Sequence, residues 1–315
     1  MNLKGILVLA TLAISTPLCA GNLFNLAKEP LIINSCPINS TDNPIDIALL
    51  SKGFFVVSNG HKDSEVLFTR FGKLFIDKDS YLRTDDGNYL LSINKKSDAK
   101  HLHKIKISTR NLPPQATRSV KYEFNLLATT PSGYDYQVSS NIYDSLGSNH
   151  LLNINLTKTQ ESTWKTTVHV DDIEVAEGFL RFDSAGELSK QEGLKDIRWP
   201  AGYGMNRLSL DFKFCTQYAS PFQVQLMKAD GYSLGVFLYV SISNHGEVIY
   251  FYNNGEYKTK KDRIAVALFT NPNYLEKINS RLYRPSERSG QPMIHWVNGE
   301  QVIQNCALEA ETCLA

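Results

Sequence analysis

The sequence predicts an all-β protein with two β domains, the second of which, a sandwich or barrel, is inserted into the first. Three observations predict this class. Apolar runs are short and rich in Val, Ile, Phe and Tyr, as in β-strands. Turn residues such as Gly, Asn, Asp and Pro recur roughly every eight to twelve residues. No stretch of the chain keeps the period of an amphipathic helix.

The bulk composition excludes several kinds of partner. A chain of 315 residues is long enough for two domains with buried cores. Its net charge of +1 creates no global field that would attract nucleic acid or an anionic membrane surface. The charged fraction of 21% is ordinary, so the chain is expected to fold. We therefore expect no nucleic-acid partner.

The first twenty residues have the pattern of a secretory signal peptide, here residues 1–20. Lys4 supplies the positive charge, residues 6–14 form a short apolar run, and Pro17 ends it. A small residue, Ala20, marks the cleavage site. No later apolar run approaches the length of a membrane span, so no integral membrane segment is expected in the mature chain. The pattern predicts export by a Sec-type route to the periplasm or the extracellular space.

Four cysteines remain after residue 20. They are Cys36, Cys215, Cys306 and Cys313. An even number of cysteines in an exported chain favours one or two disulfides, and the sequence does not choose among the pairings. The alternative is that Cys215 is a buried thiol and the others are unpaired. Their spacing does not fit zinc, because no Cys-x-x-Cys occurs and no histidine lies at ligand spacing.

Residues 21–44 are rich in Pro and Asn and predict a turn-rich linker. Residues 45–115 then predict the first segment of the core β domain. Asp77 and Asp79 could suggest calcium, but their loop lacks the Gly and the distal Glu of a calcium loop, so a hairpin turn is favoured. His101 and His103 would share one face of a strand. No third ligand lies near them in the sequence, which favours a solvated pair over a metal site.

Residues 116–207 predict the inserted domain, which begins after the strand-breaking Leu112-Pro113-Pro114. Asp144 to Gly147 has the composition of a hairpin turn, and the strand after it places Leu152, Ile154 and Leu156 on one face. Residues 182–188 predict a second hairpin turn. Residues 208–300 are expected to return to the core domain, and residues 301–315 to form a short tail.

One hydrolase-like pattern occurs in the second core segment. Gly231-Tyr232-Ser233-Leu234-Gly235 matches the nucleophile elbow, which works only on a strand–turn–helix. Residues 236–242 predict a strand instead of a helix, so a serine hydrolase using Ser233 is a remote alternative. No phosphate-binding loop opens a helix, and no carboxylate pair stands apart from the turn residues. We expect no catalytic residue, no cofactor, no metal site and no small-molecule substrate.

The ordered motifs resemble the bacterial flagellar hook and rod protein family over about residues 45–310. The first segment carries Gly53-Phe54-Phe55, Thr69-Arg70-Phe71-Gly72 and Asp79-Ser80-Tyr81-Leu82. The inserted region carries Tyr143-Asp144-Ser145-Leu146-Gly147 followed by His150 and Leu152. Each motif alone is weak, and the specificity comes from their order across two discontinuous segments.

The resemblance implies a non-enzymatic structural protein of the flagellum that acts in its assembly and in motility. Its partners would be flagellar hook or rod subunits, or further copies of itself. The family's terminal helices are missing from the expected positions, and a secretory signal stands in place of the first one. This departure motivates an alternative, an exported, hook-derived binding module that no longer polymerises. The family fold brings the two ends together, which implies a disulfide from Cys36 to Cys306 or Cys313.

Overall fold

The computed structural model describes residues 37–60, 65–94, 101–203, 207–297 and 302–310. The expected signal peptide, Cys36 and Cys313 lie outside these described residues. The described chain contains twenty-four strands and one 3-10 turn, η1 (Pro272–Tyr274), and no α-helix occurs within it. No helix of this described part is long and apolar enough to cross a membrane. The prediction of an all-β protein is confirmed.

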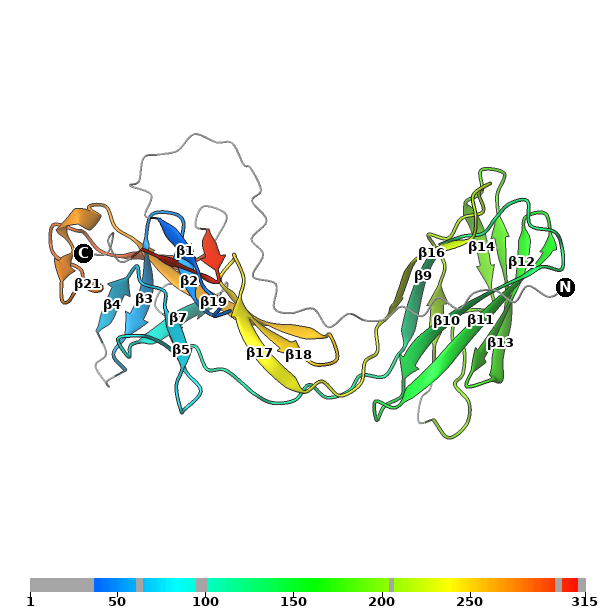
Figure 1. The fold of residues 1–315 in the computed structure, drawn as a ribbon, viewed down its shortest axis with the longest axis horizontal. Helices are drawn as coiled ribbons and strands as arrows, with labels where there is room; N and C mark the ends of the chain where they lie inside the picture. Colours follow the sequence, from blue (N-terminus) through cyan, green and yellow to red (C-terminus); the bar gives the residue numbers. More distant parts are fainter. Residues whose placement is uncertain (1–36, 61–64, 95–100, 204–206, 298–301, 311–315) are drawn as a thin grey trace. The chain divides into compact units, whose positions relative to one another are not determined.

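The chain divides into two compact units (Figure 1). Unit 1 comprises Met1–Thr109, Tyr239–Phe251 and Tyr257–Ala315. Unit 2 comprises Arg110–Leu238 and Tyr252–Glu256. The sequence of unit 2 therefore interrupts that of unit 1.

Unit 1 is built around one large, mainly antiparallel sheet with the strand order β17-β18-β19-β7-β3-β4-β21-β20. These strands are β17 (Phe237–Ile242), β18 (Glu247–Tyr252), β19 (Tyr257–Leu268), β7 (Tyr89–Asn94), β3 (Phe54–Ser58), β4 (Val66–Thr69), β21 (Leu282–Arg284) and β20 (Glu276–Lys277). Four further strands attach to it, namely β5 (Leu74–Ile76), β6 (Leu82–Thr84), β8 (Leu102–Lys104) and β22 (Met293–Trp296).

The Gly-Phe-Phe motif supplies the centre of this sheet. Strand β3 pairs with β4, β7 and β19, and Phe55 is buried. Gly53 precedes the strand with a φ of +123°, and a Cβ atom there would lie 3.0 Å from the carbonyl oxygen of Ala267. Only glycine adopts this conformation readily and allows so close an approach. The motif is therefore explained by packing.

Two short ladders join the ends of unit 1. Strand β1 (Ile38–Ser40) pairs with β24 (Ala307–Glu309), and β2 (Ile47–Leu49) pairs with β23 (Ile303–Asn305). The sequence instead predicts a linker over 21–44 and a short tail over 301–315. Each of these strands is three residues long, and its partner lies more than 250 residues away in the sequence. A strand this short has too few residues to show a periodic pattern, so it could not be predicted.

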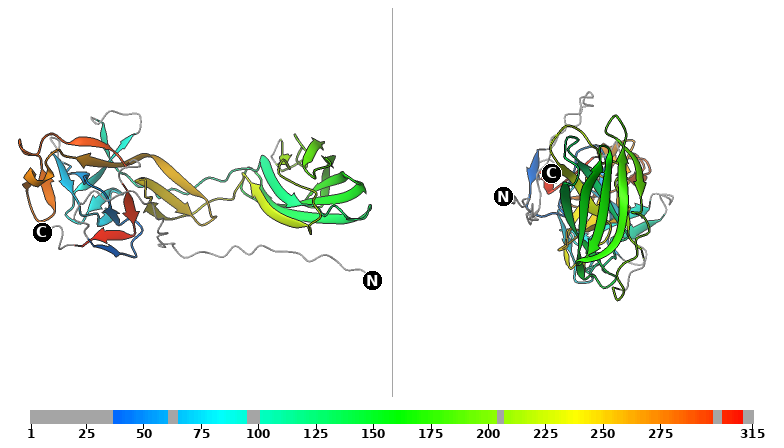
Figure 2. Two further views of the ribbon diagram at one scale, coloured as in Figure 1. Left: turned by 90° about the horizontal axis from the view of Figure 1, so that it is seen from above. Right: turned by 90° about the vertical axis from the view of Figure 1, so that its right-hand side faces the viewer.

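Unit 2 has two sheets that enclose one core (Figures 1 and 2). The first, drawn in green, is antiparallel and runs in order through β10 (Asp135–Tyr143), β11 (Asn149–Gln160), β12 (Thr163–Val170), β13 (Ile173–Phe182) and β14 (Leu188–Glu192). The second has the order β15 (Ser209–Asp211), β9 (Ser119–Asn125) and β16 (Gln223–Ala229). Their inner faces share Trp164, Tyr122 and Phe124, which are fully buried.

The return to unit 1 comes later than the sequence suggests. Residues from 208 onward are expected to rejoin the core domain, whereas β15 and β16 both pair with β9 in unit 2. Leu210 and Phe212 are buried in the core of unit 2. This segment of unit 2 continues to Leu238. Alternation of apolar residues shows which face of a strand is buried but not which sheet the strand joins.

The hairpin turns occur where the sequence predicts them. Gly147 N donates to Asp144 O between β10 and β11, and Gly186 N donates to Asp183 O between β13 and β14. In unit 1, Ser80 N donates to Asp77 O. These three predictions are confirmed.

Candidate contact surfaces

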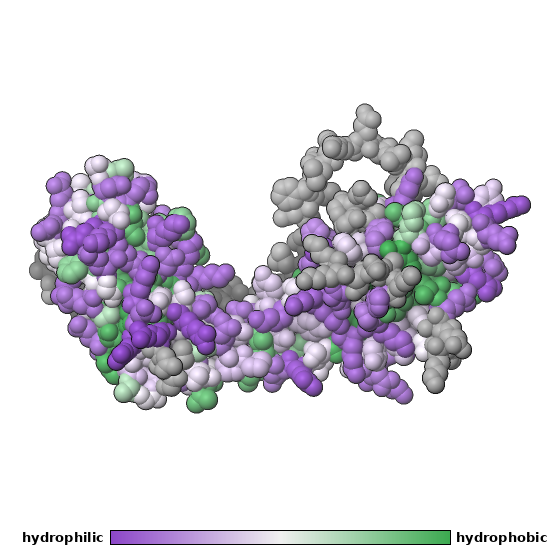
Figure 3. All heavy atoms as spheres, turned by 180° about the vertical axis from the view of Figure 1, so that it is seen from behind, coloured by the Kyte–Doolittle hydropathy of each residue, from purple (hydrophilic) through white to green (hydrophobic). Residues whose placement is uncertain are grey.

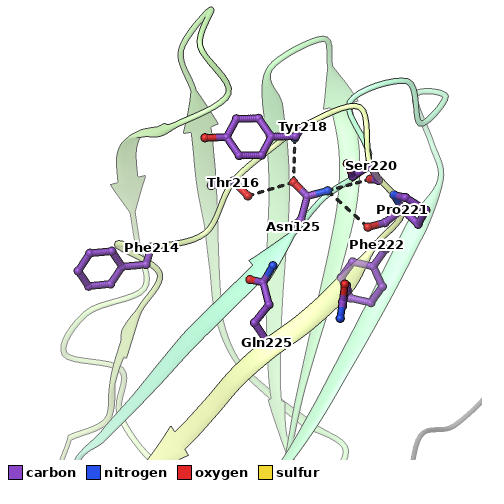
Figure 4. A pocket seen from close by; sticks show the side chains of 9 residues that line it. Asn125, Phe214, Thr216, Tyr218, Ser220, Pro221, Phe222 and Gln225 are labelled. Carbon is purple, nitrogen blue, oxygen red and sulfur yellow. Dashed lines mark hydrogen bonds between the residues drawn. The ribbon is translucent and has the colours of Figure 1, made fainter. Parts of the chain in front are cut away.

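A hollow lies on unit 2, beside the end of β9 (Figure 4). Its volume is about 530 Å³. Amide, hydroxyl and aromatic side chains line it, and the lining residues are Asn125, Phe214, Thr216, Tyr218, Ser220, Pro221, Phe222, Gln223 and Gln225. These side chains are suited to packing and hydrogen bonding.

Asn125 organises this hollow from the last position of β9. Its Nδ2 donates to Ser220 O at 2.8 Å and to Pro221 O at 3.4 Å. Its Oδ1 accepts from Tyr218 N at 2.8 Å and from Thr216 Oγ1 at 3.0 Å. Figure 4 shows these four bonds converging on one amide. The Asn125 amide therefore spends its hydrogen bonds on holding residues 216–221 in place, and it is not available to a ligand.

The rings beside the hollow remain exposed. Phe214 is 52% exposed, and the Lys121 ammonium lies 4.4 Å from the centre of its ring. Tyr218 is also exposed, and its hydroxyl donates to Glu187. Exposed aromatic residues with polar neighbours are typical of protein contact surfaces.

Strand β16 continues this surface. It lies at the edge of its sheet, and none of its residues is buried. Val224 and Met227 are opposite the buried Phe124 and Tyr122, yet they are 39% and 41% exposed. On the face drawn in Figure 3, hydrophilic residues predominate over hydrophobic ones. We call Phe214, Tyr218, Val224 and Met227 the β16 surface.

Ser233 does not lie on a nucleophile elbow. It sits between two isolated bridges, Gln115–Tyr232 and Leu112–Gly235, and the strand β17 follows. Its carbonyl oxygen accepts a hydrogen bond from Asn254 Nδ2 at 2.7 Å. The strand–turn–helix that exposes a hydrolase nucleophile is not formed here.

The cysteines fall into two groups. Cys215 is a buried free thiol whose Sγ donates to Tyr122 O at 3.4 Å. Burial raises the pKa of this thiol to about 12, so it stays protonated and unreactive. Cys306 is disulfide-bonded, and its partner lies outside the described residues. Ala310 N donates to Pro37 O at 2.8 Å, so the segments that lead to Cys36 and Cys313 lie side by side.

Neither the Asp77–Asp79 turn nor the His101–His103 pair forms a metal site in the structure. Asp77 accepts from Tyr81 N and Asp79 N, and its other oxygen pairs with Arg83. The bond from Tyr81 and the neighbouring Arg83 lower the pKa of Asp77. His101 and His103 are exposed at β8. Within the described chain, no group of three His, Cys, Asp or Glu side chains could hold a metal ion.

The fold and these surfaces define a class of protein. It is an all-β protein in which one β domain is inserted into another and whose candidate sites are suited to protein–protein contact. A family model, the flagellar basal body protein FlaE D2 domain, matches residues 111–232, which lie within unit 2.

Relatives match across both units. The flagellar hook protein FlgE of Brucella suis is 26% identical over 275 residues, covering 84% of this chain and 68% of the relative. The FlgE protein of Salmonella typhimurium is 22% identical, covering 86% and 73%. The crystal structure of the Helicobacter pylori flagellar hook protein FlgE2 has the same fold, with a TM-score of 0.64 at 15% identity, covering 86% of this chain and all of that one. The chain is thus similar to flagellar hook proteins across both units, and its residues 111–232 match the D2 domain family.

Proposed function

We propose that this chain is a structural subunit of the bacterial flagellar hook, working through protein–protein packing. The observation that carries the proposal is the breadth of the likeness. Hook proteins match 84% of the chain, so both units and their order are shared, not the inserted domain alone. The family has a structural role, and the surfaces described above offer contact area without catalytic chemistry. We infer that the chain is not an enzyme.

Its partners would be other hook or rod subunits or further copies of the chain. The β16 surface of unit 2 supports this inference, because an open strand edge with exposed aromatic and aliphatic side chains is suited to lateral contact. Location in the hook is inferred from the likeness to hook proteins. Passage through a Sec-type route into the periplasm or beyond is inferred from residues 1–20 alone.

Electron microscopy of hooks from cells that carry a tagged copy of the chain tests the structural role. We expect label along the hook, and reduced motility when the gene is deleted. Hooks without label, together with unchanged motility in the deletion strain, would contradict the proposal. Label recovered instead on a soluble non-flagellar partner would favour the exported binding module.

Amino-terminal sequencing of the exported protein tests the route. A chain that starts at Gly21 is expected. A chain that retains Lys4 and the apolar run would show that the segment is not removed.

A further inference from the structure

The hairpin turn between β10 and β11 presents a leucine to solvent. Leu146 is 82% exposed, the highest fraction among the large hydrophobic side chains that the structure describes. The backbone that carries it is held firmly. Asp144 Oδ1 accepts from Leu146 N and Ser148 N, each at 2.8 Å, and Gly147 N donates to Asp144 O at 3.2 Å. Because this backbone is already ordered, covering Leu146 with a partner would cost little further conformational entropy. We call residues 144–148 the knob.

Neighbouring segments of unit 2 brace the knob. Tyr143 N donates to Thr117 Oγ1 at 2.9 Å, and Thr117 N donates to Tyr143 O at 2.8 Å. On the other side of the turn, His150 Nδ1 lies 2.6 Å from Asp171 Oδ2, in the turn between β12 and β13. These contacts fix the knob beside Thr117, just before the first residue of β9.

The hollow described above lies toward the other end of β9. It is beside Asn125, the last residue of that strand. The seven residues of β9 span roughly 20 Å. Knob and hollow therefore lie toward opposite ends of unit 2, and a chain cannot fill its own hollow with its own knob.

The knob and the hollow match in size and polarity. The hollow has a volume of about 530 Å³, which is enough for a leucine side chain together with its small neighbours in the turn. Phe214 and Phe222 offer it apolar surface, and the amides of Gln223 and Gln225 can bond to turn backbone (Figure 4). Residues 145–148 carry no charge, and neither do the lining residues, so their contact desolvates no ion.

The charges around the two features are complementary. Lys213 lies at the edge of the hollow, with its ammonium 5.4 Å from the centre of the Phe214 ring. Asp144 supplies a carboxylate at the base of the knob. A positive edge that meets a negative base favours this docking. The hollow also shares Phe214 and Tyr218 with the β16 surface, so the contact would extend that surface.

We infer that Leu146 of one copy of the chain occupies the hollow on unit 2 of the next copy. This inference rests on the proposed structural role and specifies one contact behind it. The contact is head-to-tail, since each copy gives its knob to one neighbour and its hollow to another. A contact of this kind leaves one knob and one hollow free at the ends, so further copies can add in a row.

Equilibrium sedimentation of the purified full chain tests the contact. We expect the wild type to form dimers and longer rows as its concentration rises. Leu146→Ser should weaken association about tenfold to a hundredfold, because burying a leucine contributes about that factor to a binding constant. Folding should be unchanged, because the side chain is exposed. Ile278→Ser is the matched control, since Ile278 is an aliphatic residue of unit 1 that is 43% exposed, and it should keep wild-type association.

A variant of the hollow tests the direction of the contact. Gln225→Arg places a charge and a longer side chain in the lining, at an exposed position, and should also weaken association. An equal mixture of Leu146→Ser and Gln225→Arg chains retains one intact contact, between the knob of the second and the hollow of the first. We expect this mixture to form dimers and nothing larger, although each variant alone associates poorly.

Three results would overturn the inference. They are a wild type that stays monomeric at the highest concentration reached, a Leu146→Ser chain that associates as tightly as the wild type, and a mixture that forms no dimers. Any of these, together with label along hooks in the microscopy described above, would remove this contact and leave the structural role standing. Hooks without label and unchanged motility would contradict the structural role itself.

Discussion

Arg70, from the Thr-Arg-x-Gly motif, uses every donor of its guanidinium inside unit 1. Nε and Nη2 both donate to the carboxylate of Glu309 in β24, and the Glu309 side chain is 1% exposed. Nη1 donates to Ser51 O at 2.6 Å and to Gly53 O at 2.8 Å, and Nη2 also donates to Leu49 O. The motif arginine thus holds the C-terminal strand, the turn after β2 and the start of β3 together.

Replacing Arg70 by Met should destabilise unit 1 by about 3–5 kcal/mol, because a buried carboxylate and three carbonyl groups lose their partner. Glu309→Gln keeps an acceptor and should cost about 1–2 kcal/mol. Thermal unfolding, with hydrogen exchange of residues 303–309, measures both. Equal losses in the two variants would show that the carbonyl contacts contribute nothing.

At the level of single elements, glycines mark where two backbones touch. Ile47 N in β2 donates to Gly72 O at 3.1 Å, and a Cβ atom on Gly72 would lie 1.8 Å from Ile47 O. The glycine of the motif is therefore required by close packing of a loop on a strand.

Gly72→Ala should force β2 away from this loop and cost about 3 kcal/mol or more in thermal unfolding. Gly87→Ala is the matched control. Gly87 has a φ of +78° but open space around it, so its substitution should cost only about 1 kcal/mol from backbone strain. Similar losses at the two positions would contradict the packing argument.

The β16 surface gives a prediction about assembly. Val224→Lys combined with Met227→Lys should leave folding nearly unchanged, within about 1 kcal/mol, because both side chains are already exposed. Incorporation into hooks should fall, since two buried charges would disfavour an apolar contact.

Ile173→Lys provides the control, because Ile173 is 48% exposed and lies at the start of β13, in the other sheet of unit 2. Label counts along purified hooks compare the variants. If Ile173→Lys lowers incorporation as much as the β16 variant, the contact is not specific to this edge.

For the whole molecule, the closure of unit 1 depends on pairing its two ends. The β1–β24 and β2–β23 ladders join residues from opposite ends of the sequence. Cys306 adds a covalent link beside them. A disulfide from Cys306 to Cys36 would close a very long loop and so remove much entropy from the unfolded chain, whereas one to Cys313 would close a short loop and remove less.

Peptide mapping under non-reducing conditions should recover Cys306 linked to Cys36 or to Cys313, with Cys215 as an unlinked thiol. Reduction should lower the unfolding midpoint of unit 1 and leave that of unit 2 unchanged, because Cys215 carries no bond there. A peptide that links Cys215 to any other cysteine would contradict the buried position of its thiol.

The β class, the hairpin turns at Asp77, Asp144 and Asp183, and the likeness to hook proteins could all be predicted from the sequence, because they depend on local alternation, turn chemistry and the order of short motifs. The sequence also contains a match to the nucleophile-elbow motif at Ser233. The strand predicted after it, in place of a helix, was enough to argue against a hydrolase.

Three features became clear from the fold alone: residues 209–229 pair within unit 2, three-residue strands near the two ends pair with each other, and Asn125, Arg70 and His150 each join separate segments. One cause explains all three. A strand's pattern records which face is buried, whereas its partner, and the groups that surround a polar side chain, are set by contacts distant in sequence.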